Sequence, residues 1–124
     1  MKVACLQIKP EFKNKRKSIE RAQSLLDEMD ANDPVDLIMM PEMALIGYRF
    51  DNREDVEPYC EIVPSDIASL INTLDDEEEK EAQPCTFKFA LKVSRKFSPA
   101  WVAVGFAEKD SDGRFFNSAY VVNH

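Results

Sequence analysis

A single carboxylate, Glu42, stands at the end of an apolar run. Residues 37–40 read LIMM, and Pro41 comes between this run and the glutamate. Proline lacks an N–H and so ends the hydrogen-bond ladder of a strand, and catalytic groups of α/β sheets collect beyond the carboxyl ends of strands. A carboxylate walled by the flanking methionines could act as a general base that later returns its proton. The residues alone favour a plainer alternative, a glutamate that closes a strand-to-loop turn.

The other side chains able to do chemistry are three cysteines and one histidine. Cys5, Cys60 and Cys85 are widely spaced and form no CxxC pair, so neither a disulfide framework nor a zinc ribbon is indicated. Cys85 precedes an expected helix, whose dipole could lower the pKa of its thiol, but no motif supports it as a nucleophile. Because His124 is the only histidine, a Cys-His or Ser-His triad has little support.

A strand, a helix and a second strand must place Glu42. Residues 3–8 are mostly apolar, and 37–40 are apolar on both faces, as a parallel sheet covered by helices requires. Between them, apolar residues recur every three or four positions over 14–30, which predicts an amphipathic helix with Asn14 as its N-cap. The first third of the chain is therefore expected to be a βαβ unit.

The rest of the chain continues the α/β pattern. We expect a helix capped by Ser65, a solvated acidic run at 75–81, a helix over 84–97, and two strands, 100–108 and 114–122, joined by a hairpin loop with Gly113 at positive φ. The order β-α-β-α-α-β-β is that of an α/β fold. A length of 124 residues with 44% hydrophobic residues is enough for one domain.

Charge and hydropathy restrict the partners and the compartment. Of the net charge of −7, the run 75–81 contributes −5 (six acids and one lysine) and the other residues −2, so the acidity is one local patch. The basic tract 13–17 could bind nucleic acid or direct nuclear import, but the pattern favours the solvated start of a helix. We expect no nucleic-acid or membrane partner, since no apolar run approaches the length of a membrane span. The unpaired cysteines and the lack of a signal peptide favour a cytoplasmic location, with a nuclear one as the alternative.

The stretch LIMMPEMALIGY resembles the first catalytic motif of the nitrilase superfamily, the carbon–nitrogen hydrolases. The matching residues are Pro41, Glu42, Gly47 and Tyr48. Two further stretches are similar in order: MKVACLQIKP at the start, and VAVGFAEKDSDGRFFNSAYVV with Gly105, Glu108, Asn117, Ser118 and Ala119 in place. The resemblance implies an α/β fold that is the N-terminal part of a four-layer αββα sandwich. It implies that 1–124 is a partial carbon–nitrogen hydrolase domain, with 65–82 as an insertion.

Within that superfamily, PEMALIGYRFDNREDVEPY and FALKVSRKFSPAWVAVGFAEKDSDGRFFNSAYVVN are similar to the protein N-terminal asparagine/glutamine amidohydrolases, the N-terminal amidases. That family releases ammonia from the side-chain amide of an N-terminal Asn or Gln. The resemblance makes Glu42 the general base and acid of a Glu-Lys-Cys triad and implies no metal or organic cofactor. The family's Lys follows the fourth strand and its Cys comes later still. Neither is found among the 124 residues, so we expect this segment to be inactive alone.

Two other functions remain open. One is another amidase of the superfamily, of the ω-amidase or carbamoylase type, acting on a small amide. The other is a non-catalytic product, either a truncated chain or a pseudoenzyme half-domain. The family often dimerises, so a homo-oligomer is an open alternative. Val102, Val104, Phe116 and Tyr120 are expected on an inner sheet face that lacks its partner sheet, which would favour self-association.

An N-terminal amidase must also hold the free α-ammonium of its substrate, and a cation in a partly buried site needs carboxylates or carbonyls. The segment after the motif supplies candidates for this substrate site: Tyr48, Asp51, Glu54 and Asp55. The alternative is a solvated loop whose acids pair with Arg49 and Arg53.

Overall fold

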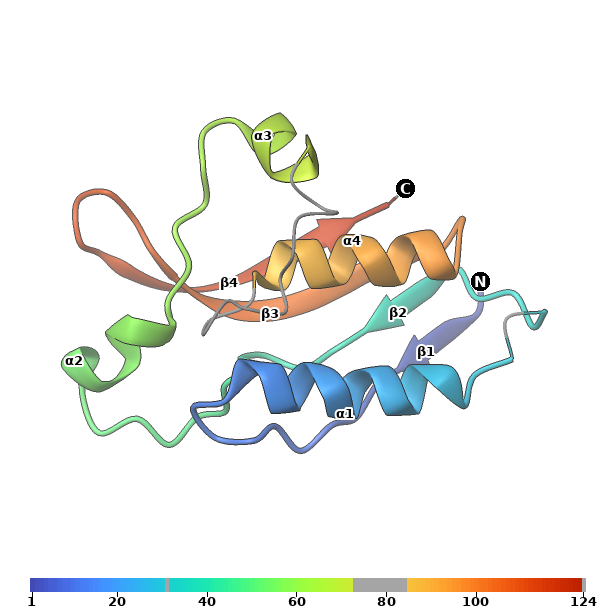
Figure 1. The fold of residues 1–124 in the computed structure, drawn as a ribbon, viewed down its shortest axis with the longest axis horizontal. Coiled ribbons are helices and arrows are strands. Elements are labelled where there is room, and N and C mark those ends of the chain that lie inside the picture. The colour runs from blue at the N-terminus through green and yellow to red at the C-terminus, as the bar shows by residue number, and fades with distance from the viewer. Residues whose placement is uncertain (31, 73–84, 124) are drawn as a thin grey trace.

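The computed structural model describes residues 1–30, 32–72 and 85–123, apart from the side chains of Ser69 and Leu70. Its elements, in order, are β1 (Val3–Cys5), α1 (Lys15–Asp27), β2 (Leu37–Met39), α2 (Arg53–Val56), the 3₁₀ helix η1 (Glu57–Tyr59), α3 (Ile67–Asn72), α4 (Thr86–Lys96), β3 (Trp101–Lys109) and β4 (Phe115–Val122). One sheet has the strand order β1-β2-β3-β4, with the first two pairs parallel and the β3–β4 pair antiparallel (Figure 1).

The expected elements form for the expected local reasons. The Asn14 side chain caps α1 by accepting a hydrogen bond from the Lys17 amide at 3.1 Å, and the periodic residues Ala22 and Leu26 are buried. Gly113 has φ +80°, as the hairpin turn requires. The helix predicted after Ser65 is α3, but its expected continuation and the whole acidic run lie outside the described residues.

Some elements differ from the sequence-based expectation. Strand β1 ends at Cys5 rather than at residue 8, although Leu6 and Ile8 are still buried. The short helices α2 and η1 were not predicted. The Asn52 side chain caps α2 through the Asp55 amide at 2.9 Å. Lys15, expected at a solvated helix start, is 2% exposed, because Glu61, distant in sequence, supplies its counter-charge.

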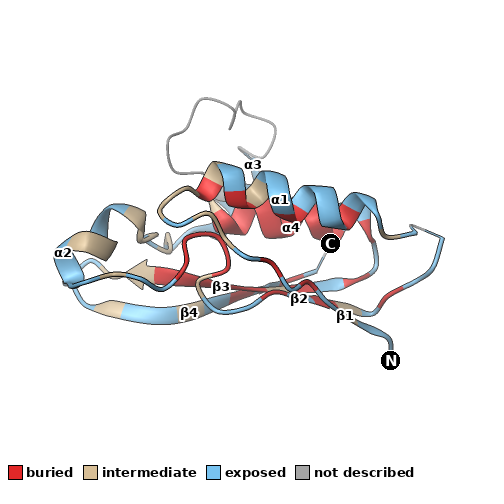
Figure 2. Ribbon diagram, turned by 90° about the horizontal axis from the view of Figure 1, so that it is seen from below, coloured by how far each residue is buried: buried red, intermediate tan, exposed pale blue. Residues whose placement is uncertain are grey.

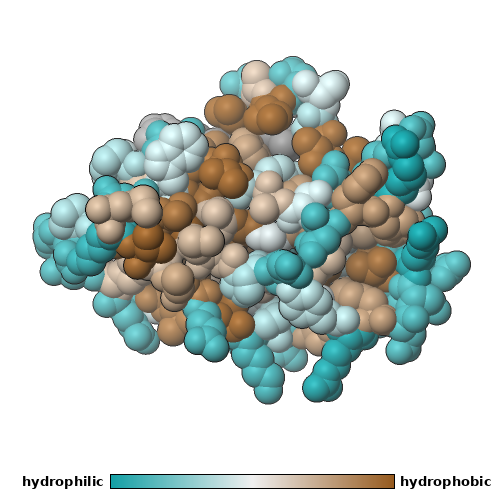
Figure 3. All heavy atoms as spheres, turned by 180° about the vertical axis from the view of Figure 1, so that it is seen from behind, coloured by the Kyte–Doolittle hydropathy of each residue, from teal (hydrophilic) through white to brown (hydrophobic). Residues whose placement is uncertain are grey.

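Helices α1 and α4 cover only one face of the sheet (Figure 2). The core lies between them and this face, where Ile38, Val102 and Val104 have no exposed surface. The opposite face is open and carries Val3, Met39, Trp101 and Val121, which are 40 to 60% exposed. Figure 3 shows this open face, with several brown apolar patches separated by polar side chains.

The assignment of apolar residues to the two faces corrects two expectations. Val102, Val104 and Tyr120 are buried on the covered face instead of lying on the unpartnered one, while Phe116 is exposed. Both faces of β3 are apolar, so alternation alone could not tell which face the helices cover. The strand that contains Cys5 was expected to be buried on both faces, yet Cys5 is exposed because it pairs with Met39 and shares its open face. No described helix is long and apolar enough to cross a bilayer.

Candidate active site

The turn that carries Glu42 stays bonded to the sheet after β2 ends. The amides of Met40 and Ala44 donate to the carbonyls of Ala103 and Gly105 on β3, at 2.9 and 3.2 Å. The turn closes on itself through the Met43 carbonyl, which accepts the Ile46 and Gly47 amides at 3.1 and 3.0 Å. Glu42 is therefore held on a rigid support at the carboxyl end of a strand, as the sequence predicted.

Gly105 makes room for this turn. A Cβ atom at Gly105 would lie 2.6 Å from the Glu42 Cα and 2.8 Å from the Pro41 carbonyl oxygen. Both are backbone atoms, which cannot rotate away as the end of a side chain could. The turn also uses positive φ values of 45° at Met43 and 79° at Gly47. A methionine in this region carries a steric cost, which the surrounding bonds must offset.

Two side chains fix one oxygen of the Glu42 carboxylate. The Tyr48 hydroxyl and the Asn117 side-chain amide each donate to Oε2 at 3.0 Å. Among the residues that the structure describes, none donates a hydrogen bond to Oε1. The carboxylate is exposed, with two polar partners, so the expectation that methionines would wall it in is wrong. The arrangement orients the carboxylate and leaves one oxygen open to a reacting group.

Strand register places Asn117 beside Glu42. Asn117 pairs with Ala107 in the β3–β4 ladder, so it shares the open face with Gly105 and its partner Ala119. Tyr48 approaches from the chain that leaves the turn. Its pKa is raised by partial desolvation and then by its hydrogen bond to the Glu42 carboxylate. The phenol therefore keeps its proton and remains a donor at neutral pH.

Residues 2–124 match the sequence model of the carbon-nitrogen hydrolase family. The chain belongs to the carbon–nitrogen hydrolases. It is 30% identical to a protein N-terminal amidase of Saccharomyces cerevisiae, over 99% of this chain and 23% of the relative. A protein N-terminal amidase of Schizosaccharomyces pombe is 29% identical, over 99% of this chain and 38% of the relative.

Solved structures give the same result for the fold. A crystal structure of N-terminal amidase superposes with a TM-score of 0.73 at 28% identity, covering 98% of this chain and 24% of that one. That enzyme has also been solved with a Gln-Val peptide and with an Asn-Glu peptide. The α/β sheet is thus a fragment of the nitrilase fold, and the chain spans between 23% and 38% of the length of these curated relatives.

Burial raises the pKa values of two thiols in this segment, which disfavours their reactive thiolate form. Burial raises the pKa of Cys85, and the nearby charge of Glu61 raises it further. The amides of Lys88 and Phe87, in the first turn of α4, do lower it, as expected at a helix N-terminus, but their effect is smaller. The prediction of a lowered pKa is therefore wrong for Cys85. Burial likewise raises the pKa of Cys60.

The acidic residues predicted to bind the substrate ammonium differ in their surroundings. Asp55 pairs with Lys13, which lowers its pKa, and it also accepts the Asp51 amide at 3.3 Å. Asp51 and Glu54 are exposed. The sequence suggested that an arginine would pair with these acids, but the partner of Asp55 is Lys13. The Arg53 guanidinium instead lies 5.9 Å from the centre of the Phe115 ring.

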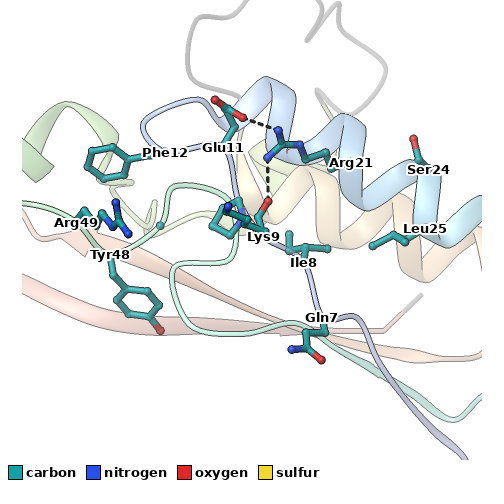
Figure 4. A pocket seen from close by; sticks show the side chains of 12 residues that line it. Gln7, Ile8, Lys9, Glu11, Phe12, Arg21, Ser24, Leu25, Tyr48 and Arg49 are labelled. Atoms are coloured by element: carbon teal, nitrogen blue, oxygen red, sulfur yellow. Dashed lines mark hydrogen bonds and ion pairs between the residues drawn. The ribbon is translucent and has the colours of Figure 1, made fainter.

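An open groove of about 850 Å³ begins at Tyr48, one side chain away from Glu42. Figure 4 shows its lining: the chain after β1, the middle and second half of α1, and residues 47–49. Arg21 crosses one side of it and donates to the Lys9 carbonyl at 3.0 Å and to the Glu11 carboxylate at 2.6 Å. The phenol of Tyr48 points away from Arg49, toward the sheet (Figure 4). No cluster of three or more possible metal ligands occurs among the described residues.

The sequence did not reveal that Asn117 and Gly105 contribute to the site. Asn117 and Gly105 stood out only as matches to the family pattern, without a role. A polar residue on a mostly apolar strand was the available signal for Asn117. A glycine inside a strand often marks close approach of another backbone, and this was the signal for Gly105.

Proposed function

We propose that this chain supplies the acid–base carboxylate of an N-terminal amidase, which hydrolyses the side-chain amide of an N-terminal Asn or Gln. The observation that carries the proposal is the bonding of Glu42: Tyr48 and Asn117 hold Oε2, and no donor among the described residues reaches Oε1. A base must offer a lone pair in a fixed direction to the proton that it takes, and the arrangement of the two donors provides this.

The reaction would proceed through a thioester. Glu42 takes the proton of a cysteine thiol, and the thiolate attacks the carboxamide carbon of the substrate. When the C–N bond breaks, Glu42 returns the proton to the departing ammonia. It then takes a proton from water, which attacks the thioester, and gives this proton to the departing thiolate, so that the N-terminal Asp or Glu and the free thiol are released. Because two donors hold Oε2 throughout, Oε1 is the oxygen that carries the proton.

The nucleophile and the lysine of the implied triad are not assigned to residues of this segment. Cys60 and Cys85 are disfavoured by their raised pKa values, and Cys5 lies on β1. In a polypeptide of the relatives' length, both groups would come from segments other than 1–124. Such a lysine would stabilise the oxyanion of the tetrahedral intermediate.

The substrate class is proposed from the relatives. Two are named protein N-terminal amidase, and the similar crystal structures of N-terminal amidase include ones with peptides that begin with Gln or Asn. A nitrilase of Pyrococcus abyssi is 29% identical over 98% of this chain and 38% of its own length. Small amides and nitriles are therefore the competing substrates.

The test uses a polypeptide of the relatives' length that contains this chain. Glu42→Gln keeps the shape of the side chain and removes the base, so ammonia release from an Asn-initiated peptide should fall by at least about a hundredfold. Peptide binding, measured calorimetrically, should change little. Glu57→Gln, which removes an exposed ion pair with Lys109, is the matched control and should leave turnover unchanged. Near-normal turnover of Glu42→Gln would refute the proposal. Release from small amides alone would favour the ω-amidase alternative, and no release from any amide would favour a non-catalytic role.

A further inference from the structure

A buried ion pair lies beneath the turn that carries Glu42. The Lys15 ammonium lies 2.5 Å from Oε1 of Glu61, with side chains that are 2% and 11% exposed. The carboxylate of Glu61 also accepts the Thr86 amide, at 3.0 Å to Oε1 and 3.2 Å to Oε2, and the Thr86 hydroxyl. The three residues come from the start of α1, the segment after η1 and the start of α4, so one carboxylate ties three parts of the chain together.

Two members of this cluster share a small gap with the turn that carries Glu42. Lys15 and Thr86 line a small gap together with Met43, Leu45 and Ile46 of the turn. The gap has no volume accessible to water, so side chains of the cluster and of the turn must move together. A displacement of Lys15 would therefore be passed to the residues next to Glu42.

The cluster also holds the strand pair that carries the amide donor. The Glu61 amide donates to the Ala107 carbonyl at 2.9 Å, and the Lys109 amide donates to the Glu61 carbonyl at 3.0 Å. Ala107 is the register partner of Asn117, whose side chain donates to Glu42. Glu61 is thus linked to both sides of the site: through Lys15 to the turn, and through its own backbone to the strand beside Asn117.

We propose that Lys15 and Glu61 are positioning residues for Glu42, a role that rests on the function proposed above. A buried ion pair adds little stability compared with apolar residues of the same size. The directional bonds of the pair, in contrast, hold three segments of the chain in one arrangement, because the Lys15 ammonium, the Glu61 carboxylate and Thr86 can bond to one another only in certain orientations. Loss of the pair should loosen the turn and lower turnover while leaving the fold intact.

The test compares Lys15→Met/Glu61→Gln with the wild type in a polypeptide of the relatives' length. The glutamine that replaces Glu61 can still accept the Thr86 amide, so the helix start keeps its partner. Because displacements near 1 Å can cost about a hundredfold in rate, kcat for an Asn-initiated peptide should fall between about tenfold and a hundredfold, with KM within about twofold. Hydrogen exchange of the Ile46 and Gly47 amides, which close the turn, should accelerate by at least about tenfold.

The matched control is Lys96→Met. Lys96 pairs with Asp27 at the opposite ends of α4 and α1, where both side chains are exposed. The Lys96→Met substitution removes a lysine from an ion pair between the same two helices, far from the turn. The kcat and the hydrogen exchange of the Ile46 and Gly47 amides should therefore stay at wild-type values. If the double variant does not fold, Thr86→Val, which removes only the hydroxyl bond to Glu61, should show the same changes at smaller size.

Three outcomes would overturn the positioning role: unchanged kcat with unchanged exchange in the turn, exchange that accelerates equally throughout the sheet, or a control that behaves like the double variant. If the wild type releases no ammonia from any amide while the turn amides exchange faster in the double variant, the proposed function fails. The mechanical link between the ion pair and the turn is then supported on its own.

Discussion

Replacing Gly105 by alanine would displace the backbone of Glu42, the residue proposed as the general base. The new Cβ would lie 2.6 Å from the Glu42 Cα, whereas ordinary van der Waals contact begins at 3.4 Å, a shortfall of about 0.8 Å. Because the opposing atoms are backbone, the turn itself must move. A misplacement near 1 Å can lower a rate by about a hundredfold, and overpacking of this kind costs about 1–3 kcal/mol of stability. We expect Gly105→Ala to lower kcat by about a hundredfold.

The assay is ammonia release from an Asn-initiated peptide, with thermal unfolding measured in parallel, again in a polypeptide of the relatives' length. Gly113→Ala is the control, because Gly113 has φ +80° and a Cβ atom added there would have no other atom within 4 Å. It should lose about 1 kcal/mol of stability through backbone strain and keep its kcat. Turnover of Gly105→Ala equal to that of the control at matched stability would refute the argument that Gly105 positions Glu42.

Further experiments test the site and the cysteines. Tyr48→Phe removes one of the two donors to Glu42, so kcat should fall about tenfold, the rate equivalent of a hydrogen bond to a charged group of about 1.5 kcal/mol. Since the pKa of Tyr48 is raised above its ordinary 10.0, its ionisation should cause no loss of wild-type activity near neutral pH. The raised pKa of Cys85 leaves less thiolate at any given pH. Iodoacetamide should therefore label the exposed Cys5 first near neutral pH, and alkylation of Cys85 should rise only in alkaline solution. Mass spectrometry of the peptides measures both alkylation rates. Asp51→Asn should raise KM for a peptide with a free N-terminal Asn and leave an acetylated peptide unaffected; equal effects on both would remove this residue from ammonium binding.

Local patterns were enough to predict most of the fold. The three-and-four spacing of apolar residues identified α1, and the Pro-Glu pair after an apolar run correctly placed Glu42 at the end of β2. These features depend on residues close together in the sequence. The family pattern then supplied a role for Glu42 that no local argument could have distinguished from an ordinary turn.

Features that depend on distant segments could not be predicted in the same way. The bond from Asn117 to Glu42 spans 75 positions and exists only because the β3–β4 pairing puts Asn117 on the open face. Lys15 looked like a solvated lysine in a basic tract, and only its partner Glu61, 46 positions away, makes its burial possible. The sequence contains these residues, but their pairing is a property of the assembled sheet.

The hairpin between β3 and β4 also limits how this part of the protein can vary. Its loop is closed by bonds from the Asp110 amide to the Arg114 carbonyl and from the Gly113 amide to the Asp110 carbonyl, at 3.0 and 3.1 Å. Surface loops generally tolerate insertions and deletions. Here a change of one residue that shifted the pairing would turn every side chain of β4 to the opposite face and take Asn117 away from Glu42. The number of residues in an exposed loop, rather than their identity, therefore keeps the carboxylate supplied with its amide donor.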